Sequence, residues 1–104
     1  MSNKPISEQY HEIATKWVDA DAAANILEEA KSATLSQRML AYPLFAVNKA
    51  EMTVRGSPQW TAYLTKMVDA RKQANLLKVQ IEYLKMRHSE WQSEEANRRL
   101  EQKL

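Results

Sequence analysis

Ser57-Pro58-Gln59-Trp60 begins the part of the chain that decides the fold. Serine suits the N-cap of a helix and proline suits its first position, so the pair predicts a helix start at Pro58. No glycine or proline follows, and apolar or aromatic side chains recur at alternating spacings of three and four residues. This heptad pattern is typical of a long packed helix, here predicted over about residues 58–102 and roughly 65 Å long. Its seam positions are Trp60, Tyr63, Met67, Ala70, Ala74, Leu77, Ile81, Leu84, His88 and Trp91.

A first helix is predicted over residues 7–41, with Ser7 as its N-cap, after a flexible lead-in at residues 1–6. Ser32 and Thr34 weaken its apolar pattern and leave room for a bend or a short gap. Its apolar stripe consists of Tyr10, Ile13, Ala14, Trp17, Ala20, Ala24 and Leu27. We expect Trp17 and Trp60 to anchor the core. The residues expected to fill that core are Met39, Met52, Met67 and Met86.

Residues 42–57 connect the two helices. Tyr42-Pro43-Leu44-Phe45 is too apolar for a solvated loop, so we expect it to pack against the helices. Asn48 and Glu51 resemble a capping box, which predicts a short helix over residues 48–55 that ends at Gly56. The fold class predicted for residues 1–104 is all-α: a helical hairpin or small bundle in one domain, with one very long, coiled-coil-like C-terminal helix.

The two long helices differ in length, because the first has about 35 residues and cannot cover all of the second. An exposed apolar stripe on the uncovered end would favour association with another protein surface. His88 occupies a seam position where a polar residue commonly sets register or oligomer state. We therefore expect a homo-oligomer. The candidate interface residues are Trp91, Ala96, Leu100, Leu104 and His88.

The composition limits the class of protein further. A single glycine in 104 residues disfavours antiparallel sheets, whose tight turns commonly need glycine. The chain has no cysteine, no apolar run long enough to cross a bilayer and no signal-peptide pattern, so we expect a cytoplasmic protein without membrane association. Residues 1–31 hold six acidic and three basic side chains, whereas the rest holds seven acidic and twelve basic ones.

No catalytic, metal or cofactor site is expected. The chain has two histidines, and His11-Glu12 lacks the second histidine of a zincin motif because Thr15 stands in its place. One glycine cannot make a phosphate-binding loop, and the chain has neither a G-x-S-x-G elbow nor a cysteine nucleophile. Glu94 and Glu95 are neighbours in sequence and do not face each other on a helix. We predict that the protein is not an enzyme and needs no cofactor.

Basic residues of the long helix allow two interpretations. In one, they flank the seam and pair with the acidic residues of the first helix, Asp19, Asp21, Glu28 and Glu29. In the other, they bind nucleic-acid phosphates. The candidate residues for either contact are Lys66, Arg71, Lys72, Lys78, Lys85, Arg87 and Arg99.

The last third of the chain resembles the C-terminal part of short helical accessory proteins of tailed bacteriophages, which are often encoded near recombination and replication genes. The resemblance lies in Asp69-Ala70-Arg71-Lys72-Gln73-Ala74-Asn75-Leu76-Leu77-Lys78-Val79 and Glu90-Trp91-Gln92-Ser93-Glu94-Glu95-Ala96. It implies an accessory role in phage DNA metabolism, or interference with a DNA-processing or defence complex in the host cytoplasm. We favour a protein-binding module of this kind. The alternative is a nucleic-acid-binding accessory of recombination or replication that uses the basic residues of the long helix.

Overall fold

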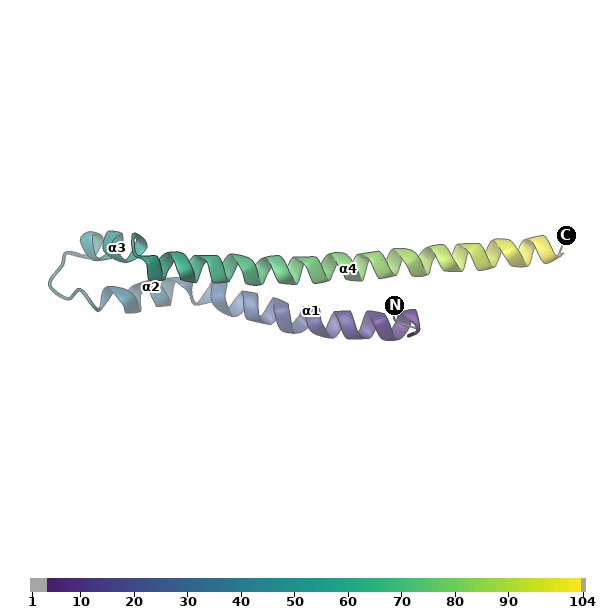
Figure 1. Ribbon diagram of the computed structural model, residues 1–104, viewed down its shortest axis with the longest axis horizontal. Coiled ribbons are helices and arrows are strands. Elements are labelled where there is room, and N and C mark those ends of the chain that lie inside the picture. The colour runs from purple at the N-terminus through teal and green to yellow at the C-terminus, as the bar shows by residue number, and fades with distance from the viewer. Residues whose placement is uncertain (1–3, 104) are drawn as a thin grey trace.

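The computed structural model describes residues 4–103, and these form four helices and no strand. The helices are α1 (Ile6–Glu29), α2 (Lys31–Met39), α3 (Val47–Arg55) and α4 (Pro58–Lys103). α1 and α4 lie side by side in antiparallel orientation, α2 continues the line of α1, and α3 packs against α2 and α4 (Figure 1). The predicted all-α hairpin with one very long C-terminal helix is confirmed.

α4 begins at the predicted residue. The hydroxyl of Ser57 accepts a hydrogen bond from the backbone N–H of Trp60 at 3.2 Å, which is N-cap geometry. The same hydroxyl donates to the carbonyl of Val54 at 2.6 Å. One serine therefore bonds to a carbonyl in the last turn of α3 and satisfies a free amide at the start of α4. From Pro58, α4 continues for 46 residues, or about 69 Å, to Lys103.

The N-terminal helical region differs from its prediction in two places. It is divided at Ala30 into α1 and α2, slightly earlier than Ser32 and Thr34 suggest. Ser7 is not the N-cap, because α1 already starts at Ile6 and the carbonyl of Pro5 accepts the first backbone hydrogen bonds. The predicted lead-in at residues 1–6 falls partly outside the described residues.

The connecting helix α3 is close to its predicted bounds, but its predicted cap is wrong. Ala46 is its N-cap without a side-chain hydrogen bond, and Asn48 lies inside the helix. Glu51 instead forms an ion pair with Arg55 one turn later, at 2.9 Å. Gly56 follows the last residue of α3 with φ of −84°, so this helix end does not use the left-handed conformation that favours glycine.

The loop between α2 and α3 is ordered by turns and by one stacked aromatic pair. The rings of Tyr42 and Phe45 stack at 5.2 Å, and Lys49 lies over the Phe45 ring at 4.4 Å. Leu44, between them, is 96% exposed. The prediction that this loop packs against the helices is therefore wrong for Leu44, because the stacked rings shield each other and leave the leucine outside.

The core is a thin seam between α1 and α4 with a small extension under α3. Trp60 is the largest fully buried side chain, as predicted, whereas Trp17 is half-buried. Met39 and Met67 are also half-buried, but Met52 and Met86 are exposed, so the prediction that they fill the core is wrong. Two layers of helix cannot cover side chains on their outer faces. The buried apolar residues among those described are Ala24, Ala50, Val54, Trp60, Ala74, Ile81 and Leu84.

The molecule is elongated. It measures 84 × 21 × 19 Å, and its radius of gyration is 23.2 Å, compared with about 13 Å for a compact domain of this length. α4 projects past the start of α1 (Figure 1). The accessible surface of 8295 Å² exceeds the roughly 6000 Å² of a compact monomer of this mass. None of the helices in residues 4–103 combines the length and the apolar character that crossing a bilayer requires.

Candidate functional site

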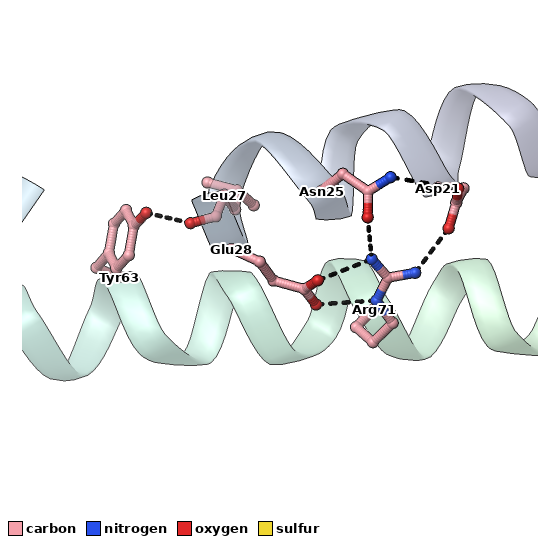
Figure 2. Close-up of polar contacts among 6 residues, drawn as sticks. All are labelled: Asp21, Asn25, Leu27, Glu28, Tyr63 and Arg71. Carbon is pink, nitrogen blue, oxygen red and sulfur yellow. Dashed lines mark hydrogen bonds and ion pairs between the residues drawn. The ribbon is translucent and has the colours of Figure 1, made fainter. Parts of the chain in front are cut away.

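The most organised polar cluster lies between α1 and α4 and centres on Arg71 (Figure 2). The guanidinium of Arg71 donates two hydrogen bonds of 2.9 Å to the two carboxylate oxygens of Glu28. It also donates to Asp21 at 2.7 Å and to the side-chain carbonyl of Asn25 at 2.6 Å. Asp21, Asn25 and Glu28 share one face of α1 because they are spaced by four and three residues. Arg71 is therefore held within the hairpin by three α1 side chains.

This cluster perturbs the ionisation of its members. The hydrogen bonds from Arg71 lower the pKa of Glu28 below its ordinary value of 4.5, although partial loss of water acts in the opposite direction. The hydrogen bonds that Arg71 donates to Glu28, and then to Asp21, raise the pKa of its guanidinium. Nearby, the hydroxyl of Tyr63 donates to the carbonyl of Leu27, one of the last four residues of α1 (Figure 2). Both contacts fix the register of α1 on α4.

Replacing Arg71 with methionine should lower the thermal midpoint of unfolding at pH 7. The variant removes the charge that joins α1 to α4 and leaves Asp21 and Glu28 close together without their cation. Since the pKa of Glu28 is lower in the folded chain, its contribution is complete above the ordinary value of 4.5 and is lost as the pH falls below it. The difference between wild type and variant, followed by circular dichroism, should therefore shrink between about pH 5 and pH 3.

Arg98 provides the matched control for this measurement. It pairs with Glu95 on its own helix at 2.9 Å, and its side chain is 62% exposed. Arg98→Met should lower the midpoint by less than Arg71→Met, because a solvated pair within one helix contributes little. Equal effects of the two substitutions, or a difference that grows in acid, would contradict the role assigned to Arg71.

The other predicted cations do not form one positive face. Lys85 lies 3.6 Å from Glu82 on its own helix, and Lys72 lines a groove described below. At 100° per residue, Lys78, Lys85 and Arg99 point to one flank of α4, whereas Lys66 and Arg87 point to the other. All six side chains belong to exposed residues. With Arg71 engaged by α1 acids, the observed pairing matches the intramolecular interpretation for that residue.

The predicted interface residues are also divided between faces. His88 and Trp91 stack at 6.1 Å and lie beside Ile6 at the start of α1. Leu100 follows Trp91 by nine residues, which places it about 180° around the continuous helix. Ala96 lies on an exposed position nearer the side of Leu100. Leu104 lies outside the described residues. The projecting end therefore does not carry Trp91 and Leu100 on one stripe.

A second apolar stripe, missed by the sequence analysis, follows the face of α4 that points away from α1. We call it the outer face and define it by Val68, Leu76, Val79, Tyr83 and Met86. Their exposed fractions range from 49% for Leu76 to 64% for Val79. From Leu76 onward they repeat at spacings of three, four and three, about 160° around the helix from the buried seam. That spacing is the signal that could have revealed a second packing surface.

Part of the outer face forms a shallow groove of about 500 Å³. Val68, Leu76 and Val79 supply its apolar lining, and Glu28 of α1 stands at its side. Further lining comes from Met67, Arg71, Lys72 and Asn75. The groove is open and apolar, which suits a protein side chain better than a charged small molecule.

The hairpin end exposes the largest fraction of a large apolar side chain among the described residues. Leu44 is 96% exposed, and three neighbours along the chain are more than 70% exposed. Those neighbours are Leu40, Val47 and Met52. We call these four residues the hairpin-end group.

Within residues 4–103, no three His, Asp or Glu side chains gather at positions that could hold a metal ion. Comparison with family models, curated proteins and solved structures finds no match to this chain.

Proposed function

We propose that this protein is a non-enzymatic accessory protein that binds a protein complex through its helical surfaces. The observation that carries the proposal is the hairpin-end group, above all Leu44, which is 96% exposed on an ordered loop. Exposed apolar side chains that cluster on a defined structure commonly mark interaction sites. Burying one leucine in a partner would contribute roughly 1.5–3 kcal/mol.

The loop is held in shape before any partner binds. The backbone N–H of Phe45 donates to the carbonyl of Tyr42 at 3.1 Å, and that of Tyr42 donates to Met39 at 3.0 Å. Together with the stacked rings, these turns fix the position of Leu44. A preordered loop loses less conformational entropy on binding than a flexible one, which favours affinity.

The class of partner rests on the resemblance to phage accessory proteins. That resemblance supports a partner in a DNA-processing or defence complex of the host, or in phage DNA metabolism. The alternative is direct binding of nucleic acid through exposed Lys78 and Lys85. It has weaker support because Lys66 and Arg87 lie on the other flank of α4, so the basic residues do not form one positive face.

Affinity purification from a bacterial host, with wild type and Leu44→Glu in parallel, tests the proposal. The substitution touches no buried group, so the helical content should be unchanged. We expect specific proteins retained by wild type to be reduced at least about tenfold with the variant, because a charge would enter an apolar contact. Ala62→Glu, an exposed change near the start of α4, is the control and should retain the same proteins.

Two results would contradict the proposal. One is an identical set of retained proteins with wild type and Leu44→Glu. The other is binding to DNA at low salt that weakens steeply as salt is added and is abolished by Lys78→Glu with Lys85→Glu, which would support the nucleic-acid alternative instead.

A further inference from the structure

We propose that the outer face of α4 binds the outer face of a second copy of this chain in antiparallel orientation, so that two hairpins form a symmetric dimer. This inference goes beyond the proposed function and uses a different surface from the hairpin-end group. It follows from the amount of exposed surface, the spacing of the apolar residues and the placement of charge at the ends of the stripe.

The exposed surface is of the size that a stable dimer buries. The chain exposes 8295 Å², which is about 2300 Å² more than a compact monomer of 12.0 kDa. Obligate homodimers bury roughly 2000–5000 Å² in total, or about half of that from each chain. The chain therefore has enough uncovered surface for an interface of this class, and the outer face supplies a part of it.

The spacing of the stripe fits pairing between helices. Leu76, Val79, Tyr83 and Met86 lie at spacings of three, four and three, the pattern of core positions in a coiled coil. All four are about half exposed or more. α1 packs on the opposite side of α4, so it leaves this stripe accessible along its length.

A two-fold axis that passes the outer face at the level of Ile81 makes the stripe complementary to itself. In the antiparallel alignment, Leu76 faces Met86 of the second copy, and Val79 faces Tyr83 of the second copy. Each contact then occurs twice, as an isologous interface requires. The apolar residues fill the centre of the stripe in this alignment.

Charge at the two ends selects this orientation. Lys72 stands four residues before Leu76, and Glu90 stands four residues after Met86. The antiparallel alignment places Lys72 beside Glu90 of the second copy at both ends. A parallel alignment would place Lys72 beside Lys72 and Glu90 beside Glu90, which is repulsive.

The oligomeric state is measured by sedimentation equilibrium from about 1 to 100 µM, a range that brackets common dimer affinities. Wild type should sediment with twice its mass of 12.0 kDa. Val79→Glu combined with Tyr83→Glu should give a monomer whose circular dichroism still reports helix, because both side chains are exposed. Met52→Glu, an exposed apolar residue of α3, should leave the dimer intact.

Charge exchange tests the orientation. Lys72→Glu alone and Glu90→Lys alone should each weaken the dimer by about tenfold, since each creates two repulsive pairs. The double variant Lys72→Glu/Glu90→Lys should recover the wild-type affinity. In a parallel dimer each of these positions would face its own copy, so like charges would meet in the wild type and in every variant, and neither single variant would weaken the dimer. A monomeric wild type throughout the range, a dimer unaffected by Val79→Glu/Tyr83→Glu, or a double variant as weak as the single ones would each overturn the inference. Leu44→Glu should remain dimeric, so failure of the proposed function and failure of this inference give different results.

Discussion

Trp60→Ala is expected to lower the free energy of unfolding by about 3–5 kcal/mol, the range for removing a large aromatic side chain from a core. Trp60 is 2% exposed at the first turn of α4 and stacks on Tyr63 at 5.4 Å. It lies where α4 begins under α3, so a cavity there would loosen both helices. Single domains of this size are stable by roughly 5–15 kcal/mol, and the variant should unfold at a much lower urea concentration.

Trp91→Ala is the matched control, because it removes the same side chain from the same helix. Trp91 is 53% exposed and stacks on His88 near the start of α1. Its removal should cost less than about 1.5 kcal/mol, since roughly half of its surface is already in water. Urea unfolding followed at 222 nm compares the two variants, and equal midpoints would contradict the role of Trp60 as the main anchor.

Ala24→Leu is expected to destabilise the hairpin by about 1–3 kcal/mol, even though leucine is the more apolar residue. Ala24 and Ala74 are both 0% exposed, on α1 and α4 respectively. Small residues at a helix–helix contact allow the backbones to approach closely, and a larger side chain must push the helices apart. Separation would also strain the hydrogen bonds that Arg71 donates to α1.

Ala23→Leu makes the same chemical change one residue earlier on α1, at an exposed position. Its effect should stay within about 0.5 kcal/mol of wild type. Thermal unfolding of the two variants at equal protein concentration separates packing from the intrinsic helix preference of leucine. A stabilised Ala24→Leu would show that the seam has unfilled space near this residue.

The sequence predicted the elements that have strong local signals. Ser57 and Pro58 define the start of α4 through backbone geometry that depends on neighbouring residues alone, and the structure has the cap as predicted. The division at Ala30 has no such signal, because neither glycine nor proline stands there. It coincides with a distant contact, the hydrogen bond from Tyr63 to the carbonyl of Leu27. The position of a helix break that coincides with such a long-range contact could not be predicted from the local sequence.

The candidate site, too, could be predicted from the sequence only in part. Asp21 and Glu28 were among the acids expected to pair with the basic residues of α4, but the choice of Arg71 as their partner depends on the register of two helices. The outer face was missed for a related reason. α4 carries two apolar stripes with heptad spacing, one through Ala74 and Ile81 and one through Val79 and Met86. Packing against α1 decides which of them is buried, and that choice is made by the tertiary structure.

Because α4 is one continuous helix, it acts as a rigid spacer of fixed length. Pro58 and Lys103 are held about 68 Å apart, because each residue of a helix advances the chain by 1.5 Å. A linker of the same length without regular structure would sample short separations most of the time. A partner bound at Leu44 is therefore kept at a fixed distance from a molecule bound near Lys103. Fluorescent labels at the two ends of the molecule should report a single narrow distribution of distances.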